Sequence, residues 1–174
     1  MVEMKVILIT LITLFAGLNL SCQTKEINLI TEQEYAVYIA VLAEKTENFI
    51  VVDVTLVDVF GEVSTGYLKE VFKELHNETF DNFVRKNKKS PTIETNFPTK
   101  NGYPVINKDD FNKNHSESGR YYAFSRVGFS KDGKQALVLF SDVCNALCGK
   151  GAYYFLMNKD GVWKIEKESE TWRS

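Results

Sequence analysis

The sequence has few of the residues from which most metal and nucleophilic sites are built. It holds two histidines and three cysteines among 174 residues, and His76 and His115 lack metal-ligand spacing to each other. A phosphate-binding glycine loop, a dinucleotide fingerprint, a metalloprotease helix and a Gly-x-Ser-x-Gly motif are all absent. The sequence therefore gives no candidate catalytic residue, no metal site and no cofactor.

The sequence also lacks an excess of charge of either sign. Its 21 Lys and Arg residues nearly balance its 23 Asp and Glu residues, which leaves a net charge of -2. We expect no nucleic-acid partner, because no basic field is available to hold one. With 44% hydrophobic and 25% charged residues, the composition is typical of a globular protein with its own core.

The N-terminal apolar run is too short to cross a membrane comfortably. Val6–Leu20 follows Lys5 and spans about fifteen residues, whereas a transmembrane helix needs roughly twenty. Such a run is typical of a secretion signal. The Ser21-Cys22 pair after it resembles the lipobox of bacterial lipoproteins, with Asn19 in place of the usual leucine. The resemblance implies that Cys22 carries a lipid; an ordinary signal peptide or an uncleaved anchor is the alternative.

These features predict three parts of the chain. Residues 1–21 are expected to be a lipoprotein signal peptide, 22–29 a tether, and 30–174 a single α+β domain. The domain would lie outside the cytoplasm, anchored to the cell membrane or the outer membrane by its N-terminal lipid.

Cys144 and Cys148 are the cysteines left once Cys22 carries lipid. In an oxidising compartment such a pair usually forms a disulfide. Bridged Cα atoms lie about 4.4 to 6.8 Å apart, whereas an extended chain separates residues four apart by roughly 13 Å, so residues 145–147 must turn tightly. A redox-active dithiol is the alternative, although its common motif has two intervening residues rather than three. A zinc site would need two further ligands.

Local signals predict helices in the first half of the domain. Thr31 and Glu34 form a capping-box pattern, which marks a helix start, and apolar residues follow at helical spacing. Residues 67–87 show the same spacing, with an interruption at His76. Residues 88–118 are rich in Asn, Lys, Pro and Ser, and we expect a long irregular connection with one short element.

Strands dominate the second half. They are expected over residues 49–57, 121–129, 135–141, 152–157 and 162–167. Asp132-Gly133 and Asp160-Gly161 are hairpin signals, so the last four strands should form an antiparallel meander. The predicted fold class is α+β, with the N-terminal helices packed on one face of a twisted antiparallel sheet that ends in this four-stranded meander.

Several segments carry a resemblance to a family. They are the stretch 124–138, Cys144, 147–149, 163–165 and Thr171-Trp172. In this combination they resemble an uncharacterised family of exported bacterial lipoproteins with a lipobox-like signal and a C-terminal pattern of strand, cysteine turn and Trp-Lys-Ile. The resemblance implies no activity.

Aromatic residues concentrate on the predicted sheet, and alternation places some of them on each face. We expect the open face to form a binding surface that contains Tyr122, Phe124, Arg126 and Tyr154. The alternative is that the 88–118 connection folds over these aromatics. A lone arginine on a sheet can bind an anion, but a cross-strand ion pair is the simpler interpretation of Arg126.

The leading functional hypothesis is a non-enzymatic envelope protein that binds another protein or a small ligand through this surface. The alternative is a thiol-redox factor or another envelope enzyme that uses Cys144 and Cys148.

Overall fold

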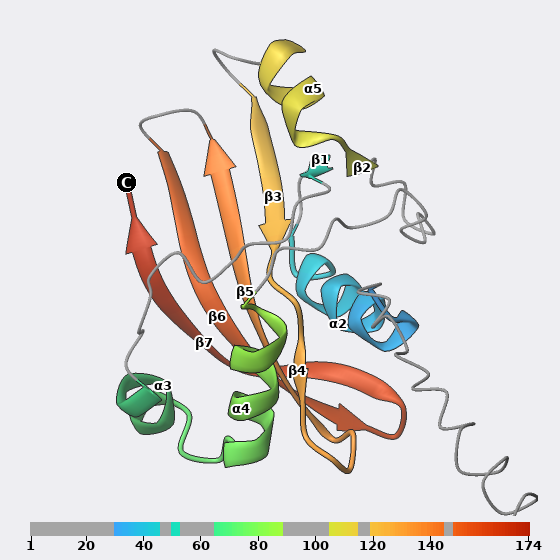
Figure 1. Cartoon of the computed structure of the whole chain (residues 1–174), viewed down its shortest axis with the longest axis vertical. Helices are drawn as coiled ribbons and strands as arrows, with labels where there is room; N and C mark the ends of the chain where they lie inside the picture. The colour runs from blue at the N-terminus through green and yellow to red at the C-terminus, as the bar shows by residue number, and fades with distance from the viewer. Residues whose placement is uncertain (1–29, 46–49, 53–64, 89–104, 115–118, 145–147) are drawn as a thin grey trace, which may run out of the picture.

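The computed structural model describes residues 30–45, 50–52, 65–88, 105–114, 119–144 and 148–174 (Figure 1). The predicted signal peptide and tether lie outside the described residues, as do His115 and residues 145–147 of the predicted cysteine turn.

Two short strands are interspersed with the helices of the described chain, and the longer strands follow the last helix. The helices are α2 (Glu32–Leu42), α3 (Thr65–Val71), α4 (Asn77–Lys86) and α5 (Lys108–Asn114). The strands are β1 (Ile50–Val52), β2 (Val105–Ile106), β3 (Arg120–Phe124), β4 (Gly128–Phe129), β5 (Gln135–Cys144), β6 (Cys148–Lys159) and β7 (Val162–Arg173).

The strands form one sheet with the order β2-β1-β3-β5-β6-β7, and β4 pairs with β5 beside this path (Figure 1). The predicted α+β class and the C-terminal meander are confirmed, because β3, β5, β6 and β7 pair antiparallel in succession. The sheet is mixed rather than purely antiparallel, since β1 lies parallel to both β2 and β3. The strand predicted over 121–129 is divided into β3 and β4 by residues 125–127.

Helices cover both faces of this sheet, so the prediction that they pack on one face is wrong. On β5, Ala136, Val138 and Phe140 belong to the core cluster that contains α2. Leu137 and Leu139, which alternate with them, belong to the cluster that contains α3 and α4. The near-continuous apolar run of β5 is the signature of a strand buried on both sides. α2 therefore lies on one face, and α3 and α4 lie on the other.

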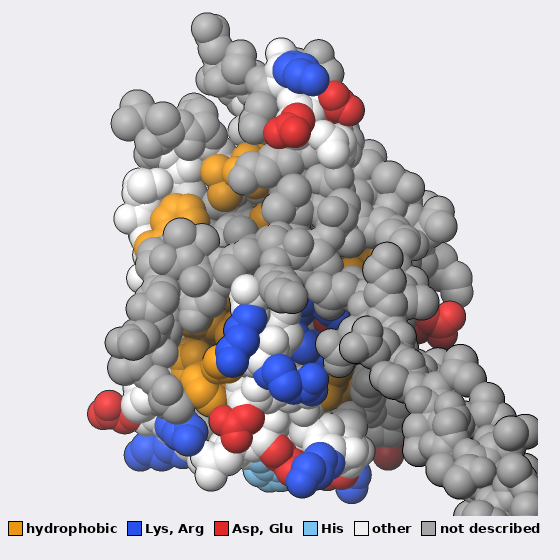
Figure 2. All heavy atoms as spheres, viewed as in Figure 1, with side chains coloured by type: hydrophobic (Ala, Val, Ile, Leu, Met, Phe, Trp, Pro, Cys, Tyr) orange, Lys and Arg blue, Asp and Glu red, His pale blue; other side chains and the backbone are white. Residues whose placement is uncertain are grey.

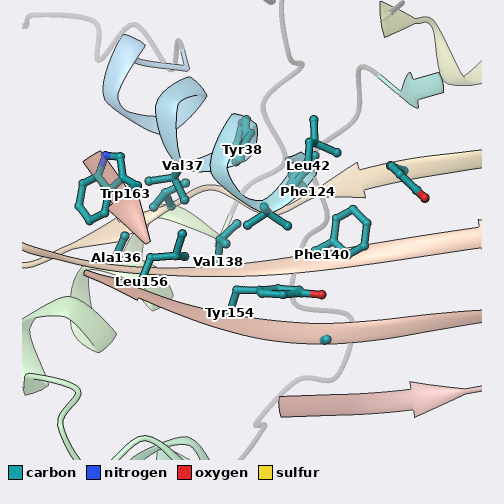
Figure 3. Packing of buried hydrophobic residues seen from close by; sticks show 14 of the residues in the cluster. Val37, Tyr38, Leu42, Phe124, Ala136, Val138, Phe140, Tyr154, Leu156 and Trp163 are labelled. Carbon is teal, nitrogen blue, oxygen red and sulfur yellow. The ribbon is translucent and has the colours of Figure 1, made fainter. Parts of the chain in front are cut away.

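The core under α2 combines aliphatic side chains with a group of contacting aromatic rings (Figure 3). Tyr38 stacks on Phe124 with ring centroids 4.5 Å apart, and its hydroxyl donates a 2.8 Å hydrogen bond to the Ser125 carbonyl. Phe140 contacts both Tyr122 and Tyr154 edge to face. Such offset and edge contacts each add about 0.5–1.5 kcal/mol beyond area burial.

The opposite face of the sheet carries a second core. There, side chains of α3, α4 and the residues between them pack on side chains of β5 and β6. The helical side is Leu68, Phe72, Leu75, Phe80 and Phe83, and the sheet side is Leu137, Leu139, Tyr153 and Phe155. Further along the sheet, α5 packs Phe111 against Ala123 and Tyr121.

The local signals are confirmed in detail. Thr31 caps α2, and both hydrogen bonds of the capping box with Glu34 are present. The interruption at His76 separates α3 from α4. Asp160 and Gly161 have φ values of 55° and 83°, so the β6–β7 hairpin turns through two left-handed residues, as a type I′ turn requires.

Gly128 makes the close approach of α4 to the sheet possible. A Cβ atom at this position would lie 2.6 Å from the Phe83 Cα atom, which is backbone and cannot move aside. We predict that Gly128→Ala lowers the free energy of unfolding by at least about 1–3 kcal/mol, the usual cost of overpacking. Urea unfolding measures this loss.

Gly66→Ala is the matched control, because no atom lies within 4 Å of a Cβ at Gly66. Alanine also favours helix, so this variant should be unchanged or slightly more stable. Equal unfolding midpoints for Gly128→Ala and the parent chain would show that α4 does not approach β4 this closely.

Candidate functional site

The predicted binding surface is buried, so this prediction is wrong. The exposed fractions are 2% for Tyr122, 0% for Phe124, 5% for Arg126 and 1% for Tyr154. Alternation did place the three aromatic residues on one face, but α2 covers that face. The helix residues that cover it are Val37, Tyr38, Val41 and Leu42.

Arg126 forms a buried ion pair with Glu34, the capping-box residue of α2. Its Nε and Nη2 atoms lie 2.8 and 3.0 Å from the two carboxylate oxygens of Glu34. The same carboxylate accepts hydrogen bonds from the backbone N–H groups of Thr31 and Val127 at 3.0 and 3.1 Å. The expected ion pair of Arg126 therefore exists, but its partner is on a helix and not on a neighbouring strand.

The end of α4 completes this cluster from the other side. Asn87 Oδ1 accepts from the Arg126 N–H at 2.8 Å, and Asn87 Nδ2 donates to the Arg126 carbonyl at 2.9 Å. Lys86 Nζ donates to the Val127 carbonyl at 3.0 Å and lies 3.5 Å from Glu34 Oε1. Three segments far apart in the sequence thus meet at the break between β3 and β4.

The charges of this cluster stabilise one another. Burial alone would raise the pKa of Glu34, but the hydrogen bond from Arg126 and the charge of Lys86 outweigh burial and lower it. Burial would lower the pKa of Arg126, and the hydrogen bond with Glu34 raises it instead. The pKa of Lys86 is lowered, because its burial outweighs the attraction of Glu34. Glu34 is therefore ionised at neutral pH. Its contacts join α2 to the sheet, so the Glu34–Arg126 pair is a structural joint between these elements and not a ligand site.

We predict that Glu34→Gln lowers the free energy of unfolding by roughly 3–5 kcal/mol at pH 7, because Arg126 is left buried without its counter-charge. The folded pKa of Glu34 lies below its unfolded value of about 4.3. The stabilisation is therefore complete above that pH and is lost as the pH falls through the folded pKa. Urea unfolding between pH 7 and pH 3 measures both effects, and the variant should lose less stability on acidification.

Glu170→Gln serves as the control, since Glu170 pairs with Arg173 on an exposed part of β7. It should leave the unfolding midpoint unchanged. A Glu34→Gln variant as stable as the parent would show that the buried pair does not hold α2 to the sheet.

A row of charged residues crosses the sheet beyond the C-terminal end of α2. Asp142 accepts from Arg120 through both oxygens, at 2.8 and 2.7 Å. Lys150 lies opposite Asp142 in the β5–β6 register and 3.4 Å from Glu168 on β7. Signs therefore alternate across four strands, which is a favourable arrangement of neighbouring charges on a sheet.

Lys45 and Tyr154 join this row to the core. Lys45 Nζ donates to the Tyr154 hydroxyl at 3.1 Å and lies 5.2 Å from the centroid of the Phe140 ring. Burial raises the pKa of Tyr154, and the negative charge of Glu168 raises it further. Burial has the opposite effect on Lys45 and lowers its pKa. Lys45 Nζ also lies 5.4 Å from the centroid of the Tyr154 ring, which belongs to the core. The sequence did not point to Lys45, which follows a helix end with no motif around it.

Cys144 and Cys148 form the predicted disulfide at the end of the β5–β6 hairpin. They lie opposite each other in the register, with Cα atoms 5.2 Å apart. Trp172 packs over this end of the hairpin, where a Cβ at Gly149 would lie 2.9 Å from its ring. The glycine after the cysteine pair therefore makes room for a tryptophan of the neighbouring strand.

An open groove lies between α2 and the first residues of β7. Its volume is about 720 Å³, and its lining consists of Ala36, Ile39, Ala40, Ala43, Glu44, Gly161, Val162, Trp163, Lys164 and Ile165. Apart from two charged residues the lining side chains are apolar, and Val162 is 57% exposed. The sequence carried a weak signal of this groove, namely alanines on α2 where a polar outer face is expected.

A second hollow, of about 690 Å³, lies at the α3–α4 turn and is polar. Its charged residues include Lys69, Lys73, Glu78 and Asp81. On the face shown in Figure 2, acidic and basic side chains are interspersed around α3 and α4, and neither sign forms a continuous patch among the described residues. This hollow therefore shows no preference for a ligand of one charge.

No protein-family model, curated protein or solved structure matches this chain. Within the described ranges, no three His, Cys, Asp or Glu side chains lie where they could hold a metal ion. None of the helices α2 to α5 is long and apolar enough to pass through a membrane. The groove between α2 and β7 is therefore the feature of the described residues that bears most directly on function.

Proposed function

We propose that this protein is a non-enzymatic envelope lipoprotein, anchored by lipid on Cys22, whose domain binds an apolar ligand in the groove between α2 and β7. The observation that carries the proposal is the groove itself. It is open to solvent and lined mainly by alanine, isoleucine, valine and tryptophan side chains. Exposed apolar hollows of this kind are typical of binding sites.

The lining selects for a ligand with little polarity. Of its side chains, only those of Glu44 and Lys164 are charged. A ligand with many polar groups would lose its hydration here without regaining hydrogen bonds. An aliphatic chain has no such cost and gains about 0.8 kcal/mol for each methylene that it buries. The acyl chain of a lipid is the ligand class that fits best, and an anchored protein meets it at the membrane.

The buried carboxylates Glu34 and Asp142 support a binding role over a catalytic one, because each is held in an ion pair. Glu34 and Arg126 hold α2 to the sheet, and Asp142 and Arg120 link β5 to β3. These groups are used in ion pairs that stabilise the fold. Among the described residues, none of these pairs lines the groove.

The anchor and the disulfide are tested together by the intact mass of the protein extracted from membranes. We predict a chain that begins at Cys22 and carries added acyl mass. Alkylation under denaturing, non-reducing conditions should add nothing, because Cys144 and Cys148 are bonded to each other. An unlipidated chain would refute the anchor. Two alkylated thiols would instead favour the alternative, a thiol-redox enzyme.

The groove is tested by tryptophan fluorescence, because the chain has two tryptophans and one of them, Trp163, lines the groove. The probe is 9,10-dibromostearate, whose bromines quench a tryptophan that they contact. The experiment uses residues 23–174, which include every described residue. We predict saturable quenching in Trp172→Phe, which keeps Trp163, and none in Trp163→Phe, which keeps Trp172 beside the disulfide.

Ala40→Glu is the variant that tests whether the quencher binds in the groove. Ala40 lies on the groove wall of α2 and is half-buried, so a charge there should weaken quenching of Trp163 at least tenfold without unfolding the helix. Equal quenching of the two tryptophans, or quenching that never saturates, would refute an apolar ligand site in the groove.

A further inference from the structure

The groove runs along α2, and its apolar wall gives way to a cation where the helix ends. Ala36 and Ala43 line this wall, Glu44 is its last residue, and Lys45 follows directly. The Lys45 N–H donates to the Leu42 carbonyl at 2.9 Å, so the chain stays in a tight turn against the end of the helix. Lys45 therefore lies where the apolar wall stops.

The sheet beneath α2 shows the same order from apolar to polar. Trp163, which lines the groove, lies on the Val37 side of α2, whereas Phe140 and Tyr154 lie toward its other end (Figure 3). The Lys45 side chain packs its ammonium group over these last two rings. Val37 and Lys45 are eight residues apart in the sequence, which corresponds to about 12 Å along a helix. The groove thus extends from a tryptophan toward a lysine.

Lys45 is a half-buried cation that has no ion-pair partner among the described residues. Its Nζ atom donates to the Tyr154 hydroxyl at 3.1 Å and contacts the faces of the two rings. An ammonium group has three hydrogen-bond donors, and in the described part of the chain one of them is accepted. The remaining donors are available to a ligand in the groove.

The carboxylates nearest to Lys45 are held by other cations. Asp142 lies 2.7 Å from Arg120, and Glu168 lies 3.4 Å from Lys150. Burial and the charge of Lys150 lower the pKa of Lys45, and the attraction of the surrounding carboxylates does not outweigh them. The charge of Lys45 is therefore incompletely compensated within the domain, and an anion at Nζ would stabilise it.

The second cation of the groove lining, Lys164, is less suited to this role. It lies opposite Met157 in the β6–β7 register, and Met157 packs against the second core on the other face of the sheet. Side chains that are directly opposite each other on paired strands share a face. The Lys164 side chain is therefore directed away from the face that carries α2.

The surroundings of Lys45 also limit the charge of a ligand. The negative charges of Glu168, Glu44 and Asp142 act at this position, so a doubly charged phosphate would be repelled more strongly than a carboxylate. An alcohol or an ester would form no ion pair. A carboxylate has one charge, and its hydrogen bond with an ammonium group is among the strong ones.

We infer that the ligand of the groove is a long-chain fatty acid, with its carboxylate on Lys45 Nζ and its chain directed along α2 to Trp163. The inference rests on the proposed function and adds to it the head group and the orientation of the ligand. The middle of the chain, about 12 Å from the carboxylate, then lies beside Trp163.

The head group is tested by comparing 9,10-dibromostearate with the corresponding dibrominated alcohol. Both are titrated into Trp172→Phe of residues 23–174, in which Trp163 is the fluorophore. The acid should bind about tenfold more tightly than the alcohol, because it alone forms the ion pair. Lys45→Met, which keeps an unbranched side chain without the charge, should lose this preference and retain its affinity for the alcohol.

Two further variants are the matched controls. Lys45→Arg keeps the positive charge, so it should keep the preference for the acid. Lys164→Met removes the other cation of the lining and should leave both affinities unchanged. If Lys45 only stabilised the end of α2, Lys45→Met would weaken the acid and the alcohol equally.

The orientation is tested by moving the bromines along the chain. In 2,3-dibromostearate they lie beside the carboxylate and hence near Lys45, so at saturation this acid should quench Trp163 less than 9,10-dibromostearate does. The reverse order would overturn the orientation.

The outcomes separate this inference from the proposed function. Saturable quenching with equal affinities for acid and alcohol, or an acid preference that survives in Lys45→Met, would refute the carboxylate site while leaving an apolar ligand in the groove. If neither probe quenches Trp163 saturably, both the groove ligand and its head group are refuted.

Discussion

The fold depends on the bidentate ion pair between Glu34 and Arg126. These residues are 92 positions apart in the sequence, and their contact fixes the first turn of α2 on the point where β3 gives way to β4. A buried carboxylate is tolerated there because each of its oxygens accepts hydrogen bonds from several donors. Asn87 and Lys86 bind the same break from α4. Polar contacts at this one break thus hold helices on both faces of the sheet.

The groove between α2 and β7 is a consequence of this arrangement. α2 is held by its first turn near the β3–β4 break, and it covers β5 and β6 with its apolar side. The edge strand β7 extends beyond this cover, so the alanines on the flank of α2 and the start of β7 face each other across solvent. A helix centred over β7 would have filled the hollow. The placement of the joint therefore determines where the groove lies.

Features encoded by neighbouring residues could be predicted from the sequence. The capping box at Thr31, the Asp160-Gly161 turn and the Cys144–Cys148 bridge all depend on residues within a few positions of one another. The arrangement of the helices could not be predicted in this way. Which face α2 covers depends on contacts between distant segments, and the partner of Arg126 is a case in point. The unbroken apolar run of β5 did signal burial on two faces.

The predicted surface of Tyr122, Phe124 and Tyr154 failed for the same reason, since alternation along a strand identifies a face but not what lies above it. The position of the joint also has a mechanical consequence. The described fold begins at Ile30, which is buried in the core under α2, and Thr31 follows it, one turn before Glu34. Tension along an N-terminal anchor would therefore act on the packing of Ile30, the capping box and the ion pair before it reached the rest of α2. A buried bidentate ion pair thus stands between that load and the aromatic residues of the core.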